Sequence, residues 1–121
     1  MLAQNTPNQL ERYRNDPSAI MRDAGLTPDP WRSSLLASEA DKTLVLCSRQ
    51  AGKSSTVAMI VLRTALLRPA TTCIVLAPIQ PQANELLRKV STAYYRIGRP
   101  VELLREGQTY IELVNRSRII A

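Results

Sequence analysis

The sequence predicts an α/β fold, a parallel sheet flanked by helices, and three segments in the middle of the chain carry that prediction. Residues 43–47 and 72–77 each continue as an apolar run after an initial Thr, which is typical of strands covered by helices on both faces. Between them, residues 53–67 contain neither Pro nor Gly and repeat apolar residues at helical spacing, which predicts a long helix. This order favours two parallel strands joined by a helical crossover.

The amino-terminal region predicts one or two short helices within the first 25 residues. Thr6-Pro7 and Asp16-Pro17 each place an N-cap residue before a Pro at the first helical position, and Gly25 is a helix stop. Residues 27–30 alternate Pro with Thr and Asp and predict a loop. This part therefore reaches the first strand through helices and a Pro-rich connection.

The carboxyl-terminal part predicts one more helix and then a change to short strands. Residues 82–97 repeat apolar side chains on one helical face and end at Gly98. Residues 101–104, 110–113 and 119–121 are short apolar segments separated by Gly-containing and Asn-containing turns. We expect a β meander that leads into another core strand.

Composition narrows the range of functions. The chain has 121 residues, of which 45% are apolar, and a formal charge of +6; this suits one core and a polyanionic partner, or simply a solvated basic surface. The absence of His excludes a His-dependent triad in this stretch. Cys47 and Cys73 form no CxxC pair, which favours a reduced, intracellular protein. The longest apolar run, residues 57–62, is too short to span a bilayer, and the start lacks the apolar core of a signal peptide.

A phosphate-binding motif follows the first predicted strand. Residues 47–54, Cys-Ser-Arg-Gln-Ala-Gly-Lys-Ser, fit a Walker A loop, G-x4-G-K-[ST], except that Cys47 stands in place of the first Gly. Backbone N–H groups and the positive end of the following helix can cradle a β-phosphate, and Gly52 allows close backbone approach. Lys53 would reach the β- and γ-phosphates, and the Ser54 hydroxyl would bind Mg²⁺. The alternative is an ordinary turn with an exposed Lys.

Residues 44–55 resemble the variant Walker A of the large terminase subunits of tailed phages, which often carry an Arg-Gln pair inside the loop, here Arg49 and Gln50. The resemblance extends upstream to Pro30-Trp31 and downstream to the strand end at residues 75–78, and so covers most of the chain from about residue 28. It implies a P-loop NTPase fold of the RecA/ASCE type, with ATP and Mg²⁺ as cofactors.

The resemblance also implies roles for individual residues. Lys53 and Arg49 would be catalytic, with Arg49 acting in cis on the γ-phosphate; the alternative for Arg49 is a carboxylate partner elsewhere. In terminases the segment before the first strand holds the adenine, usually with a Gln after the Trp, and here Arg32 follows Trp31. Trp31 fits equally well as a core anchor. The implied nucleotide-binding residues are Ser48, Arg49, Gln50, Ala51, Gly52, Lys53, Ser54, Ser55, Trp31 and Arg32, with Ser54 as the metal ligand.

A polar segment follows the second predicted strand. The carboxyl ends of strands in open α/β sheets are where ligands bind. In helicase-like ATPases the corresponding loop contacts the nucleic-acid backbone. Gln80 and Gln82, with Arg88 and Lys89 farther along, have side chains suited to phosphate contacts. A solvated helix start explains them as well.

Two segments are predicted: an N-terminal helical and adenine-side segment (1–40), and the first part of a P-loop ATPase domain (41–121). A Walker B strand ends in an Asp that holds Mg²⁺, with a following Glu, yet no Asp follows Asp41. We therefore expect an incomplete ATPase domain, without the Walker B strand and without the nuclease domain that the resemblance implies. Alone, this chain would hydrolyse ATP poorly or not at all.

The expected function is that of the N-terminal fragment of a phage terminase large subunit, the ATP-binding part of an ATP-driven DNA packaging motor. The partners that the resemblance implies are double-stranded DNA, the portal protein and the small terminase subunit. The full-length motor would be a homo-oligomeric ring at the prohead portal in the host cytoplasm, with no membrane. The alternatives are a fragment of a helicase-type ATPase and a non-catalytic nucleotide or nucleic-acid binding module.

Overall fold

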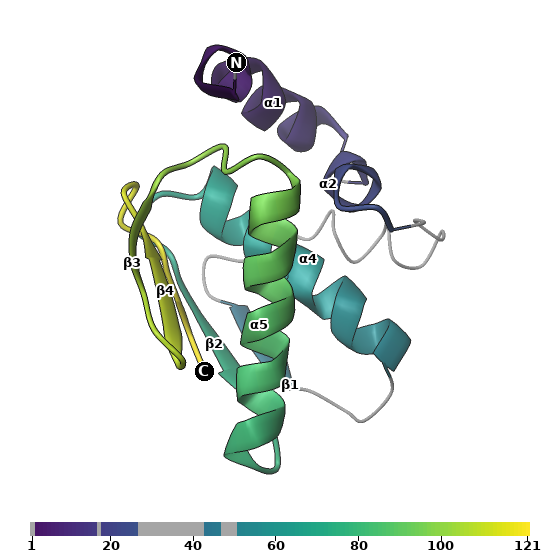
Figure 1. Cartoon of the computed structure of the whole chain (residues 1–121), viewed down its shortest axis with the longest axis vertical. Helices are drawn as coiled ribbons and strands as arrows, with labels where there is room; N and C mark the ends of the chain where they lie inside the picture. The colour runs from purple at the N-terminus through teal and green to yellow at the C-terminus, as the bar shows by residue number, and fades with distance from the viewer. Residues whose placement is uncertain (1, 17, 27–42, 47–50) are drawn as a thin grey trace.

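The structure is a computed structural model that describes residues 2–16, 18–26, 43–46 and 51–121 (Figure 1). In residues 2–8, 43–46 and 51–54 it describes the backbone alone. The described residues form a mixed α/β arrangement in which helices pack against a mixed sheet.

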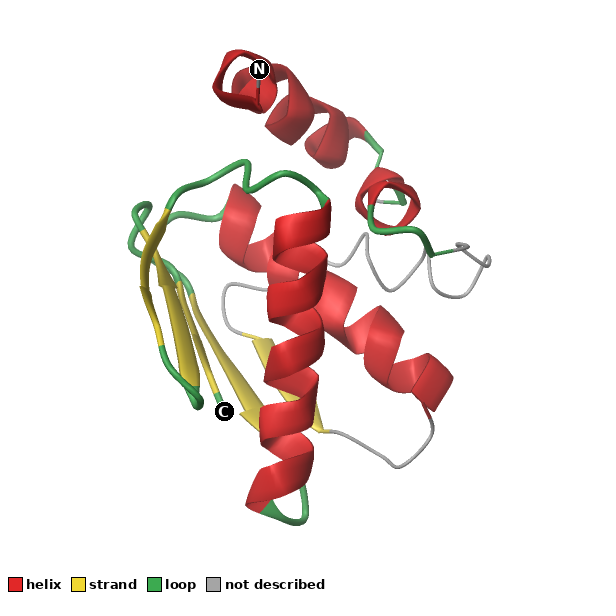
Figure 2. Cartoon of the chain, in the orientation of Figure 1, coloured by secondary structure: helices red, strands yellow, loops and turns green. Residues whose placement is uncertain are grey.

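Five strands form the sheet, in the order β1-β2-β5-β4-β3 (Figure 2). β1 (Thr43–Leu46), β2 (Thr72–Leu76) and β5 (Arg118–Ile120) are parallel. β4 (Tyr110–Leu113) pairs antiparallel with β5, and β3 (Leu103–Glu106) pairs antiparallel with β4. The predicted parallel pair and the predicted meander are confirmed. The sheet is therefore mixed, because the short turns between β3, β4 and β5 can join only antiparallel neighbours.

The two faces of the sheet differ in burial along β2. Cys73 and Val75 are buried, whereas Ile74 and Leu76 on the opposite face are 42% and 47% exposed. Both long helices lie on the buried face (Figure 1). The apolar run had predicted a strand covered on both faces, and for β2 that prediction is wrong at these positions.

The helices α4 (Ala51–Leu67) and α5 (Gln80–Arg96) lie side by side and both contact β2. They correspond to the two predicted long helices, and each begins two residues earlier than the sequence pattern indicated. Their facing apolar stripes bury side chains against each other and against the sheet, as the periodicity predicts. The core residues contributed by these two helices include Ala58, Met59, Val61, Leu62, Ala65, Leu66, Ala83, Leu86, Leu87, Val90 and Ala93.

The turn between β4 and β5 holds the carboxyl end of α4. The backbone carbonyl of Ala65 accepts hydrogen bonds from Asn115 Nδ2 at 2.9 Å and from the hydroxyl of the buried Ser117 at 2.6 Å. The last carbonyls of a helix have no partner within the helix, so side chains that reach them complete its hydrogen bonding. This contact fixes α4 on the sheet.

The described residues before β1 form the helices α1 (Leu2–Asn15) and α2 (Ala19–Asp23). The prediction that Thr6-Pro7 marks a helix start is wrong, since α1 begins at Leu2. Pro7 is the sixth residue of this 14-residue helix, so its missing N–H removes one intrahelical hydrogen bond without ending the helix. The second predicted start is better supported, because Asp16 Oδ1 accepts a hydrogen bond from the Ser18 N–H at 3.1 Å. Gly25 ends this region with a φ of +84°, as expected of a helix stop.

Tyr13 joins the two short helices to each other and to α4. Its side chain has no exposed surface, and its hydroxyl donates to Asp23 Oδ2 at 2.6 Å and accepts from Gln9 Nε2 at 2.8 Å. Its backbone carbonyl accepts from Arg63 Nε on α4 at 3.1 Å. Burial and the bond to Asp23 raise the pKa of Tyr13 well above its usual value of 10.0.

This raised pKa predicts a loss of stability at alkaline pH. The unfolded chain releases the phenol proton near pH 10, whereas the folded chain retains it to higher pH. The stabilisation is complete below pH 10, and it falls by at most about 1.4 kcal/mol per pH unit as the pH rises through the folded pKa. Urea unfolding between pH 8 and 11, compared with Tyr13→Phe, measures the effect. A wild-type slope no steeper than that of the variant would contradict it.

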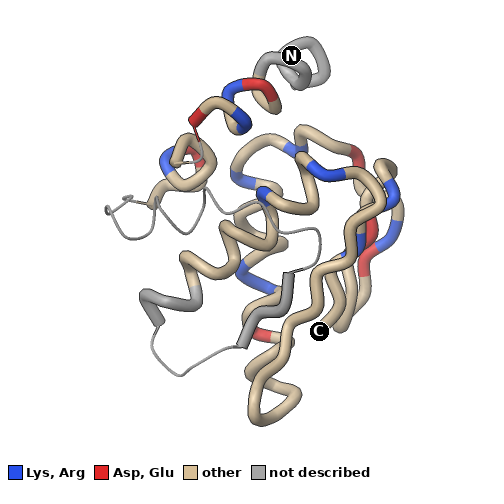
Figure 3. The backbone as a smooth tube through the Cα atoms, turned by 180° about the vertical axis from the view of Figure 1, so that it is seen from behind, with Lys and Arg blue, Asp and Glu red and all other residues tan. Residues whose placement is uncertain are grey.

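Basic and acidic residues are spread over several elements of the described chain (Figure 3). Ion pairs join Arg12 to Asp23 and Arg22 to Asp16 in the α1–α2 region.

No helix among the described residues has the length and apolar character needed to cross a bilayer.

Candidate nucleotide-binding site

The strand, loop and helix order that a Walker A motif requires is present in the backbone. β1 ends at Leu46 and α4 begins at Ala51. β1 pairs in parallel with β2, from Thr43 opposite Cys73 to Leu46 opposite Leu76. Both strands therefore end at the same edge of the sheet, the edge where open α/β sheets bind ligands.

The amino end of α4 suits an anion. This helix is 17 residues long and carries no acidic residue in its first turn. Its first backbone N–H groups lack partners within the helix, and its dipole places partial positive charge there. A phosphate at this end would meet donors without a neighbouring carboxylate.

The predicted site residues fall into three groups. Ser48, Arg49 and Gln50, and Trp31 and Arg32 on the adenine side, lie outside the described residues. The backbone of Ala51, Gly52, Lys53 and Ser54 forms the first turn of α4, and their side chains are not described. Ser55 is the one predicted site residue whose side chain is described; it is half-buried and borders a cavity.

The first part of α4 whose side chains are described is firmly packed. Thr56 is 1% exposed, and Ala58 and Met59 are buried immediately after it. The helix that would present the phosphate-binding amides is therefore held by its own core contacts, in addition to the bonds of Asn115 and Ser117 at its other end. A preorganised helix end binds an anion without first having to be ordered.

The segment after β2 leads directly into α5. Ile79 is the N-cap residue, with Pro81 in the first turn, and Gln80 Nε2 donates to Asn84 Oδ1 at 2.9 Å. Arg88 pairs with Glu85 at 2.6 Å on the exposed surface. Gln80 is exposed and Gln82 half-buried. The sequence prediction of nucleic-acid contacts at this segment remains a prediction.

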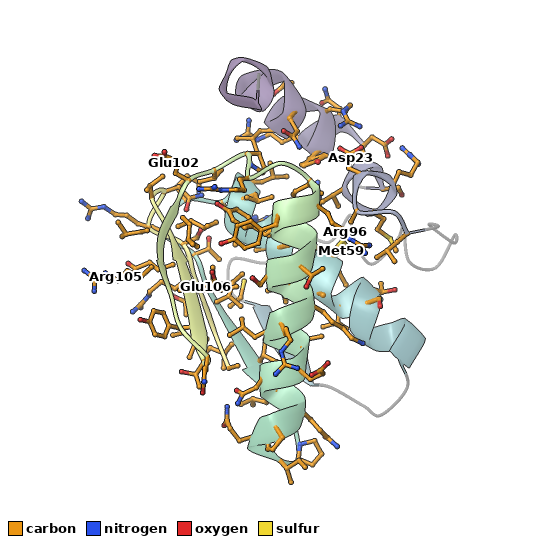
Figure 4. The ribbon with its side chains drawn as sticks, in the orientation of Figure 1. Asp23, Met59, Arg96, Glu102, Arg105 and Glu106 are labelled. Carbon is orange, nitrogen blue, oxygen red and sulfur yellow. The ribbon has the colours of Figure 1, made fainter. Side chains whose placement is uncertain are left out.

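A cavity of about 230 Å³ was not predicted from the sequence (Figure 4). Its walls come from the end of the α2 region, from α4 and from α5, including Leu26, Met59 and Arg96. In Figure 4 Met59 and Arg96 lie next to each other where these elements meet. One wall could have been found from the sequence, because polar residues recur at helical spacing along one face of α5. These residues are Glu85, Arg88, Lys89, Thr92 and Arg96.

Carboxylate ligands of the kind that hold a metal are scattered. The described residues contain no group of three or more Cys, Asp or Glu side chains that could hold a metal ion. Ser54 remains the predicted Mg²⁺ ligand.

No protein-family model matches the chain, and a comparison with curated proteins gives no match.

Proposed function

We propose that this chain is the phosphate-binding part of a terminase large subunit ATPase, the enzyme that drives DNA into a phage prohead. The observation that carries the proposal is the position of the motif. The Walker A residues 47–54 span the connection between a strand paired in parallel and a long helix without a carboxylate at its amino end. A chance Gly-Lys-Ser in a surface turn lacks this context.

The motif residues have distinct roles in the proposed site. The backbone N–H groups at the start of α4 would bind the β-phosphate, and Lys53 would bind the β- and γ-phosphates. Ser54 would hold Mg²⁺, which neutralises phosphate charge when it is bound. Arg49 would stabilise the charge on the transferred phosphoryl group.

DNA, the portal protein and the small terminase subunit are the proposed partners, on the strength of the resemblance. The segment after β2 is the proposed DNA contact, because it lies at the edge of the sheet where β1 also ends. A helicase-type ATPase shares both features and is the second candidate. The two differ in what a longer reading frame would encode: an RNase H-like nuclease for a terminase, or a second RecA-like domain for a helicase.

Nucleotide binding to the chain tests the proposal. Calorimetric titration with ADP and Mg²⁺ is expected to show a binding event that Lys53→Ala weakens about 10- to 100-fold, because charged hydrogen bonds to phosphate are worth about 1.5–3 kcal/mol. Arg105→Ala is the matched control, since Arg105 is exposed on β3, at the edge of the sheet opposite β1. Binding that is equal in wild type and Lys53→Ala would overturn the proposal.

A further inference from the structure

The cavity between the α2 region, α4 and α5 has an apolar floor. Leu26, Met59 and Ala93 line it, and further Ala residues keep the floor low. Its volume of about 230 Å³ is smaller than the usual site for a drug-sized molecule and suits a single ring system. A methionine sulfur makes favourable contacts with aromatic rings.

The rim of the same cavity is basic along α5. Arg88 is paired with Glu85 at 2.6 Å, whereas Lys89 and Arg96 on the same wall have no ion pair with a described residue. In the described part of the chain, Lys89 has neither an ion pair nor a hydrogen bond. Arg96 donates through Nη1 to the backbone carbonyl of Ala24 at 3.2 Å, and its remaining N–H groups are available to a ligand.

The two cations are arranged for a ligand that is both flat and anionic. Lys89 and Arg96 are separated by about 10 Å along the axis of α5, or two helical turns. Between them, Thr92 places a hydroxyl on the same rim, and Ser55 places another on the α4 wall. A guanidinium can stack on an aromatic face, while an ammonium acts as a point charge for phosphate.

We propose that this cavity binds one nucleotide unit, with the base against Leu26 at the apolar end of the cavity, near the buried Met59 and beside Arg96, and the phosphate on Lys89. A base uses the apolar floor and the hydroxyl groups, and a phosphate satisfies the unpaired ammonium. The carboxylates of an acidic peptide could pair with Lys89 and Arg96, but only one of its side chains could fill the apolar part of the cavity. The unit could come from a free nucleotide or from a nucleic-acid strand, and both present the same chemistry. The cavity shares Ser55 with the predicted nucleotide-binding residues, and its described lining contains none of residues 47–54.

Titration with AMP in the presence of EDTA, followed by NMR of the methionine methyl groups, tests this site. We expect a saturable shift of the Met59 signal, with a Kd of the order of 1 mM or tighter. Met21 is the internal control, because it is fully buried and does not line the cavity. Adenosine alone and inorganic phosphate alone are each expected to bind more weakly than AMP.

Two variants locate the site. Lys89→Gln, which preserves helix propensity, should weaken AMP binding at least fivefold with the Met21 signal unchanged. Lys53→Ala should leave the AMP-induced shift of Met59 in place; its loss would overturn the proposal, since the base would then belong to a nucleotide on the Walker A motif. The ADP titration of Lys53→Ala described above tests the proposed function separately.

Two further ligands distinguish a free nucleotide from a nucleic-acid strand and a nucleotide from an acidic protein segment. A short deoxyadenosine oligonucleotide that shifts Met59 at lower concentration than AMP would assign the site to a strand, and the reverse order would assign it to a free nucleotide. A Met59 shift with poly-L-glutamate and none with AMP would overturn the proposal in favour of an acidic protein segment. Absence of a shift with both AMP and the oligonucleotide would also overturn it.

Discussion

Val75→Asp is expected to unfold the protein, whereas Leu76→Asp, one residue farther along β2, is expected to leave it folded. Val75 is 1% exposed beneath the helices, and Leu76 is 47% exposed on the opposite face. A carboxylate at position 75 would lose its hydration without gaining a charged partner, which costs at least about 4 kcal/mol. That loss is comparable to the whole stability of many small domains, about 5–15 kcal/mol.

Circular dichroism and urea unfolding of both variants measure this difference. The pair is matched in strand and in the residue introduced, so it isolates the face of the sheet. Leu76→Asp should cost no more than about 1 kcal/mol, because an exposed charge keeps its water. Unfolding of both variants would show that the second face of the sheet is also covered, as the apolar run at residues 72–77 had suggested.

The apolar run of β2 shows what the sequence can and cannot predict about this fold. The sequence predicted β2 as a strand, β1 as its parallel partner and α4 as the helix between them, because these features depend on local periodicity and on the order of elements. It could not show which face would be open, since Ile74 and Leu76 are as apolar as Cys73 and Val75. Burial of a strand face depends on where distant helices pack, and periodicity carries no information on that.

The candidate site also has one part that the sequence could predict and one part that it could not. The Walker A motif was recognisable because its residues are consecutive, and the helix that follows it was predicted from periodicity. The cavity was not recognisable, because Leu26, Met59 and Arg96 are far apart in the sequence and meet only through packing of the α2 region, α4 and α5. The sequence suggests nucleic-acid phosphate contacts for Arg88 and Lys89, which remains a prediction, and the structure places both residues on the cavity wall.

Asn115→Ala is expected to destabilise the protein by about 3 kcal/mol, from two lost hydrogen bonds of about 1 kcal/mol each and the cost of leaving buried polar groups unpaired. Asn115 Nδ2 donates to the Ala65 carbonyl at 2.9 Å, and its Oδ1 accepts from the Ser117 N–H at 3.0 Å and lies 2.6 Å from the Ser117 hydroxyl. This one side chain therefore connects the end of α4 to the β4–β5 turn. Its removal also leaves polar groups around the buried Ser117 without a partner.

Asn84→Ala on α5 is the matched control. The Asn84 side chain accepts one exposed hydrogen bond from Gln80 at 2.9 Å, and its loss should cost no more than about 0.5 kcal/mol. Urea unfolding measures both variants. Equal effects would mean that the turn does not anchor α4. If α4 is anchored there, Asn115→Ala should also raise amide exchange along the last turns of the helix, because the anchoring bonds hold that end against local opening. The amino end of α4, held by the separate core contacts of Thr56 and Met59, should retain its protection and its affinity for ADP.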